Sequence, residues 1–149
     1  MLTGAIIGGI VGLLIVVFSF FIKEQRFNKV LKSITAPNME YAALYHYASF
    51  KRYKNSFKFF DSYGVLYLVG KTVYYKTTET ATPLAFDLNE CSVEQEPDWR
   101  LVKWFSITTP PGEKFYFNSH KMGMLKSNSE ETLKGFAVLK AKMASSPAV

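Results

Sequence analysis

The longest run of apolar positions lies at the start of the chain, from Leu2 to Ile22. Only Thr3 and Ser19 interrupt it, and both can hydrogen-bond back to their own helix. A helix over this run is about 30 Å long, which matches the hydrocarbon core of a bilayer. No basic residue precedes the run and bulky residues close it, unlike a cleaved secretory signal. The pattern therefore predicts an uncleaved transmembrane helix over residues 1–22.

Basic residues follow the apolar run directly. They are Lys23, Arg26, Lys29 and Lys32. Basic residues beside a span stay on the cytoplasmic side, so we expect the N-terminus outside and the rest of the chain in the cytoplasm. The same cations can contact anionic headgroups. Apolar residues recur among them at helical spacing, which predicts that the helix continues until Ala36-Pro37 interrupts it.

Glycines mark one face of the predicted span. Gly4, Gly8 and Gly12 recur every four residues, and Gly9 lies beside them. Such a groove lets a second helix approach closely, which predicts pairing with another copy or with another membrane protein. The alternative is that the groove faces lipid.

Aromatic and basic residues alternate in the next segment. Nine of the 23 positions from Tyr41 to Tyr63 are aromatic, and four cations lie among them: Lys51, Arg52, Lys54 and Lys58. The spacing of Tyr41, Leu44 and Tyr45 fits a helical face, so we expect helix to about Tyr53 and extended chain after it. The mixture is typical of a nucleic-acid surface, of a membrane-interface belt or of ordinary core packing. A neighbouring membrane anchor disfavours nucleic acid. Residues 23–55 are thus predicted to form a juxtamembrane helix and a helical connector.

Short strands dominate the soluble domain, which we expect over residues 56–143. The clearest signal is a hairpin in which two β-branched and aromatic runs flank Gly70-Lys71. Turn residues also occur at Pro97-Asp98 and Pro110-Pro111. Six strands are predicted, over residues 64–69, 72–76, 83–88, 91–95, 101–108 and 114–118. Their regular spacing favours an antiparallel meander.

The end of the chain changes to a helical pattern. A polar loop over residues 119–128 leads into Ser127-Asn128-Ser129-Glu130, a possible capping box. The helix carries an apolar stripe formed by Leu133, Phe136, Leu139 and Met143, and Val138 lies off this stripe. Residues 144–149 are expected to form a tail.

This architecture, six or seven antiparallel strands closed by one C-terminal helix, resembles the pleckstrin-homology-like superfold, including its small bacterial membrane-tethered members. The hairpin GVLYLVGKTVYYK and the helix SEETLKGFAVLKAKM carry the resemblance. It implies a six- to seven-stranded barrel or meander of the α+β class that binds peptides, proteins or lipid headgroups without catalysis. Lipid-binding members hold inositol phosphate with basic residues around the loop between the first two strands. Here the first clear hairpin offers only Gly70-Lys71, so that site is absent unless residues 50–58 supply an earlier strand.

The net charge of +6 is local. Residues 23–58 hold eight basic and two acidic side chains, and residues 59–149 hold ten of each. The basic pI is therefore weak evidence for a nucleic-acid partner.

The residues that carry chemistry are sparse. The two histidines, His46 and His120, are far apart, and the single Cys91 is typical of a small buried residue. Glu94 and Glu96 share one face of a predicted strand, which suggests a solvated acidic edge or a contact for a basic partner. We expect no enzyme, metal or cofactor.

The sequence thus predicts a membrane-anchored binding or assembly module, an accessory or scaffold subunit of a membrane protein complex. The alternative is a peripheral reader of anionic lipid through Lys51, Arg52, Lys54 and Lys58. A second alternative is an enzyme with an unfamiliar site.

Overall fold

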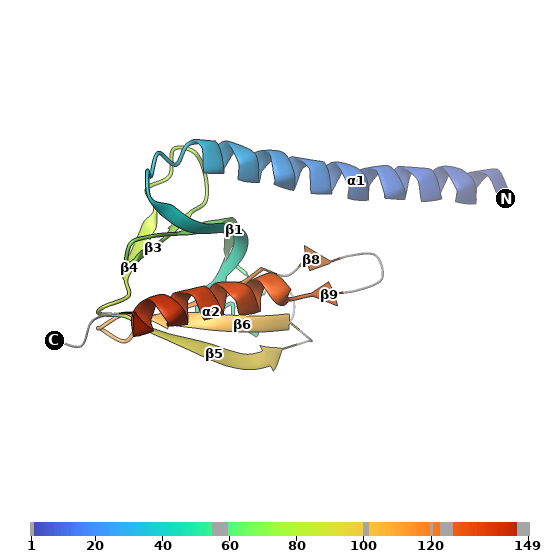
Figure 1. Ribbon diagram of the computed structural model, residues 1–149. Coiled ribbons are helices and arrows are strands. Elements are labelled where there is room, and N and C mark those ends of the chain that lie inside the picture. The colour runs from blue at the N-terminus through green and yellow to red at the C-terminus, as the bar shows by residue number, and fades with distance from the viewer. Residues whose placement is uncertain (1, 55–59, 100–101, 120, 123–126, 146–149) are drawn as a thin grey trace.

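The computed structural model describes residues 2–54, 60–99, 102–119, 121–122 and 127–145. Its first element is helix α1 (Leu2–Lys32), which projects from the rest of the molecule as a long arm (Figure 1). The described large apolar side chains from Ile10 to Ile22 are 45–65% exposed. Within the described ranges, no helix is long and apolar enough to cross a membrane. The span predicted over residues 1–22 is not confirmed and stays a prediction.

The C-terminal part of α1 packs on the domain. The helix continues beyond Ile22 as predicted and ends at Lys32, where the hydroxyl of Ser33 donates to the carbonyl of Val30 at 2.7 Å. Val30 is buried against Val65 and Tyr67. A direct apolar contact therefore joins α1 to the sheet.

Seven antiparallel strands form one sheet in the order β4-β3-β2-β1-β7-β6-β5. Their bounds are β1 (Met39–Ala48), β2 (Ser62–Val69), β3 (Thr72–Lys76), β4 (Leu84–Asp87), β5 (Ser92–Trp99), β6 (Val102–Thr108) and β7 (Lys114–Asn118). Two runs of sequential strands, β1 to β4 and β5 to β7, are joined where β1 pairs with β7. With a helix after them, these strands confirm the predicted α+β class and the seven-stranded antiparallel sheet.

Strand β1 corrects the prediction of a helix up to Tyr53. Tyr41, Ala43 and Tyr45 are buried and their neighbours are more exposed, which is the two-residue period of a strand. Residues four apart share a face in both a helix and a strand, so Tyr41 and Tyr45 fitted either period. The sheet begins at Met39, so residues 39–48 belong to the domain and not to a connector.

The predicted hairpin around Gly70-Lys71 is confirmed, whereas the prediction of a turn at Pro97-Asp98 is wrong. Val69 pairs with Thr72 around Gly70, whose φ of +58° favours glycine. The turn expected at Pro97-Asp98 lies inside β5, which continues to Trp99 through a register irregularity. Because β5 is an edge strand, the missing N–H of Pro97 removes no necessary ladder bond.

Helix α2 (Glu130–Ala144) lies against β1, β5 and β6 and covers the core (Figure 1). Its buried residues are Thr132, Gly135 and Leu139. Two details of the predicted stripe are wrong, because Leu133 is 41% exposed and Val138 packs against the core.

The predicted capping box before α2 is also wrong. Ser129 is the N-cap residue and makes no side-chain capping bond, and its hydroxyl accepts a hydrogen bond from the backbone of Lys103 instead. The expected polar loop before it contains a short pair of strands, β8 (Lys121–Met122) and β9 (Ser127–Asn128).

Candidate functional site

The predicted basic cluster lies in the loop between β1 and β2. Lys51 and Lys54 are exposed there, whereas Lys58 lies outside the described residues. Arg52 is paired, because its Nε lies 3.4 Å from Oδ1 of Asp61. Asp61 also accepts a backbone hydrogen bond from the other end of the loop at 2.7 Å. Arg52 therefore stabilises the loop. Among the described residues of the loop, Lys51 and Lys54 are the cations with exposed side chains.

Tyr53 anchors this loop to the outer face of the sheet. Its ring stacks on Tyr116 with centroids 4.1 Å apart and meets Trp104 edge-on at 5.3 Å. Its hydroxyl donates to the carbonyl of Pro97 at 3.2 Å. Burial raises the pKa of Tyr53 to about 12. Core packing, one of the three expected roles for the aromatic residues, therefore holds for this ring.

Phe50 lies beside the exposed lysines and is not part of the core. It is 76% exposed, the highest value among the large apolar side chains described. With Lys51 it borders a groove of about 480 Å³ that is also lined by Gly112 and Glu113 of the turn between β6 and β7 and by Lys114 at the start of β7. The sequence marked Phe50 as one of many aromatic residues, and nothing in it distinguished this exposed ring from the buried ones.

The basic residues after the apolar run meet the domain at Tyr63. The guanidinium carbon of Arg26 lies 4.9 Å from the Tyr63 ring centroid, and its Nη1 donates to the hydroxyl at 3.5 Å. The ammonium of Lys23 lies 5.9 Å from the same centroid. Two of the four predicted cations, Lys23 and Arg26, are thus attracted to one aromatic face.

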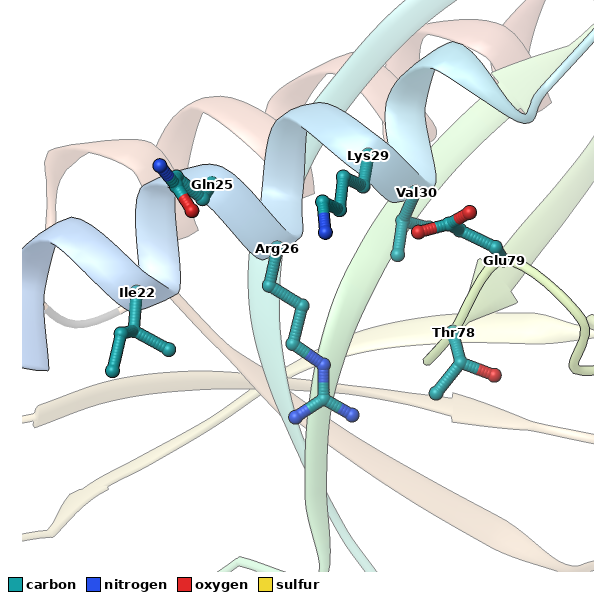
Figure 2. A pocket seen from close by; sticks show the side chains of 7 residues that line it. All are labelled: Ile22, Gln25, Arg26, Lys29, Val30, Thr78 and Glu79. Atoms are coloured by element: carbon teal, nitrogen blue, oxygen red, sulfur yellow. The ribbon is translucent and has the colours of Figure 1, made fainter.

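A cleft of about 310 Å³ opens between α1 and the loop that follows β3. Figure 2 shows its lining: α1 contributes Ile22, Gln25, Arg26, Lys29 and Val30, and the loop contributes Thr78 and Glu79. The sequence suggested Arg26 and Lys29 through their charge. It gave no signal for Thr78 and Glu79, which reach the cleft only through the folding of the sheet.

Three loops gather at one end of the sheet, which we call the loop end. Arg26 of α1 contacts Tyr63 at the start of β2, and Val30, further along α1, contacts Tyr67, further along β2. Strand β2 therefore runs beside α1 in the same direction. The start of β2, with the end of β1 beside it, therefore lies toward the N-terminal half of α1. The loop after β3 and the turn before β7 lie at the same end, because Lys76 pairs with Val65 and Ala48 pairs with Tyr116.

The acidic edge on β5 is partly neutralised. Glu94 and Glu96 share a face as predicted, and Nζ of Lys114 lies 3.3 Å and 2.9 Å from their carboxylates. The hydrogen bond with Glu96 raises the pKa of Lys114. The hydroxyl of Ser106 also donates to Glu96 at 2.6 Å. These contacts favour a structural role for this edge.

The predicted helix-packing face is only partly described. A Cβ added at Gly12 would meet nothing within 4 Å, so this position is open to a partner. For Gly4, Gly8 and Gly9 the structure describes the helical backbone alone. The predicted helix pairing stays a prediction.

The residues with potential for metal or nucleophilic chemistry are dispersed. Cys91 is buried, and burial raises the pKa of its thiol. His46 packs against Phe60 with ring centroids 4.8 Å apart. His120 lies outside the described residues. In the described part of the chain, no group of three or more His, Cys, Asp or Glu side chains could hold a metal ion.

No family model matches the sequence, and a search of curated proteins also found no match.

Proposed function

We propose that the protein is a non-enzymatic binding module held at a membrane surface by α1, where it serves as an accessory or scaffold subunit of a membrane protein complex. In this proposal the N-terminus is outside and the sheet domain is in the cytoplasm. The observation that carries it is the exposed apolar surface of α1 from Ile10 to Ile22. Apolar surface of this extent marks a site of contact with lipid or protein.

The joint between α1 and the domain supports a positioning role. Val30 is buried against β2, and Arg26 packs on Tyr63. Because these contacts begin directly after the apolar run, a membrane around that run would lie close to the loop end. Seven antiparallel strands before one helix also support the pleckstrin-homology-like resemblance, which implies a binding scaffold.

Membrane fractionation tests this proposal. We expect the full chain to pellet with membranes, to resist high salt and to dissolve in detergent. Protease added to intact cells should leave the domain uncut. Purification in mild detergent should recover a membrane protein at fixed stoichiometry. Release by high salt would overturn the anchor, and recovery of the chain alone would overturn the assembly role.

A second candidate function is contact with anionic lipid through the loop between β1 and β2. Because β1 is a strand, this loop lies between the first two strands, where the resemblance places headgroup contacts in lipid-binding members. Lys51 and Lys54 are exposed at the loop end beside the exposed ring of Phe50. Cations attract anionic headgroups, and an aromatic ring suits the interface below them.

A fluorescent variant separates this candidate from simple anchoring. In nanodiscs, the emission of Phe50→Trp should shift to the blue when anionic lipid is added, relative to wild type with its native Trp99 and Trp104. The additional changes Lys51→Gln and Lys54→Gln should abolish the shift. Lys134→Gln with Lys140→Gln removes the same charge from exposed positions of α2 and should not. If the blue shift is the same with and without each pair of lysine substitutions, the lipid contact is refuted.

A further inference from the structure

The cleft between α1 and the loop after β3 combines charges of both signs. Arg26 and Lys29 enter it from α1, and Glu79 enters it from the loop with the Thr78 hydroxyl nearby (Figure 2). Arg26 is oriented by the Tyr63 ring and hydroxyl. A ligand that matches this lining carries an anionic group and a cationic group a short distance apart.

The apolar part of the cleft indicates what else such a ligand contains. Ile22 borders the cleft and is 46% exposed, at the end of the apolar run. Val30, further along the same helix, is buried against the sheet. The charged groups therefore lie between an apolar helix surface and a folded domain, which suits the polar head of an amphiphile whose tail follows α1.

We propose that this cleft binds one phospholipid whose headgroup carries both a phosphate and a primary ammonium group, as in phosphatidylethanolamine. Arg26 and Lys29 contact the phosphate, as guanidinium and ammonium groups commonly do. Glu79 accepts hydrogen bonds from the ammonium group, and the acyl chains extend past Ile22. This inference rests on the proposed membrane attachment of α1.

Glu79 distinguishes this ligand from a purely anionic lipid. A headgroup such as phosphatidylglycerol has no cation to offer the carboxylate and would be repelled by it. Phosphatidylcholine has the same phosphate, but its methylated nitrogen has no N–H to donate. The cleft should therefore select the ethanolamine headgroup over both, whereas Lys51 and Lys54 in the separate loop would select anionic lipid.

Lipid retention measures this selectivity. The full chain is extracted in mild detergent from vesicles with equal amounts of phosphatidylethanolamine, phosphatidylcholine and phosphatidylglycerol, and the retained lipids are counted by native mass spectrometry. We expect one phosphatidylethanolamine per chain, enriched about threefold over phosphatidylcholine, the ratio typical of one exposed ion pair. Glu79→Gln should reduce this ratio to near one, and Glu24→Gln, the same change on α1 and outside the lining of the cleft, should leave it unchanged.

A second pair of variants tests the phosphate contacts. Arg26→Gln with Lys29→Gln should reduce retention of phosphatidylethanolamine and phosphatidylcholine about tenfold, because both share the phosphate. Lys23→Gln with Lys32→Gln removes two cations of the same helix from outside the cleft and should have little effect. Soluble phosphoethanolamine at millimolar concentration should not displace the lipid, since it lacks the acyl chains.

Several results would overturn the inference. They are equal retention of the three lipids, equal effects of Glu79→Gln and Glu24→Gln, equal effects of the two pairs of cation variants, or full displacement by soluble phosphoethanolamine. If the chain stays in the membrane in these cases, the proposed function survives and only the cleft assignment fails. Release of the chain from vesicles by high salt would instead overturn both.

Discussion

The two helices of this protein use their apolar residues differently. Helix α2 buries Thr132, Gly135 and Leu139 against the sheet. Among the α1 side chains that the structure describes, only Val30 is buried. Both helices carry many apolar residues, yet the chain packs Phe136, Val138, Leu139 and Met143 of α2 against its core and leaves most of the described apolar side chains of α1 in contact with solvent.

This difference separates a helix that stabilises the fold from one whose apolar surface the described chain leaves largely uncovered. Each Å² of apolar surface removed from water contributes about 25 cal/mol, so the exposed surface of α1 is stabilised only when lipid or another protein covers it. Substitutions in α2 should therefore change the free energy of unfolding of the domain. Substitutions in the N-terminal half of α1 should change only its interactions.

The largest expected effect is that of Leu139→Ala in α2. Leu139 is fully buried in the main core cluster, so the truncation removes apolar contacts and leaves a cavity. We expect the free energy of unfolding to fall by about 2–5 kcal/mol. Chemical unfolding of the full chain, followed by the fluorescence of buried Trp104, measures the change.

Leu133→Ala is the matched control on the same helix. Leu133 is 41% exposed, so the same change should cost less than about 1 kcal/mol. If the two variants were equally destabilised, α2 would not be oriented as described, and the distinction between the two helices would lose its basis.

The elements predicted correctly from the sequence are those fixed by local signals. The hairpin around Gly70-Lys71 has both β-rich arms and a turn that needs a positive φ. Strand β1 was mistaken for a helix because its buried tyrosines are four residues apart. Only its place between β2 and β7 decides in favour of a strand, and that pairing joins residues distant in the sequence.

The same division holds for the candidate site. The charge pattern identified Lys51 and Arg26, but it could not show that Arg52 is held by Asp61. Glu79 enters the cleft because β3 pairs with β2, and β2 packs on α1. Contacts of this kind depend on tertiary structure, so no local pattern around Glu79 reveals them.

Two glycines offer a smaller and more direct comparison of the helices. A Cβ added at Gly135 would lie 2.0 Å from the Tyr45 hydroxyl, whereas one added at Gly12 would meet nothing within 4 Å. Gly135→Ala should therefore reduce the free energy of unfolding by about 1–3 kcal/mol, because α2 must move away from β1. Gly12→Ala should leave it unchanged within about 0.5 kcal/mol.

Thermal unfolding of the full chain in detergent tests both glycine variants. Tyr45→Phe removes the hydroxyl that the new methyl group would meet, so we expect it to restore part of the loss caused by Gly135→Ala. A destabilised Gly12→Ala variant would show that the N-terminal half of α1 contributes to the folded domain, contrary to the comparison.

The last expected effect is a loss of stability at alkaline pH, which should weaken the α2 contact through the buried tyrosines Tyr41 and Tyr45. The hydroxyl of Tyr41 donates to Oε1 of Glu131 at 2.6 Å, and that of Tyr45 donates to the Glu131 carbonyl at 2.7 Å. Burial raises the pKa of both tyrosines, and the carboxylate of Glu131 raises it further. Their folded-state pKa values lie above the usual value near 10, so their contribution is fully present below pH 10 and is lost as the pH rises further. Above pH 10, the ionisation of each of these two tyrosines should lower the free energy of unfolding by about 1.4 kcal/mol per pH unit.

Unfolding midpoints measured between about pH 8 and pH 11 test this contribution. We expect a flat profile up to about pH 10 and a decline above it, with a shallower decline in Tyr45→Phe. The contact of Val30 with β2 includes a titrating group, Tyr67, whose pKa burial also raises. The cleavage test is therefore run in Tyr67→Phe, in which protease cleavage between α1 and β1 should not increase before α2 is released. A decline that is equally steep in Tyr45→Phe would mean that the alkaline loss arises elsewhere. Cleavage after Lys32 that precedes the release of α2 would show that α1 is the more weakly attached helix even at its buried end.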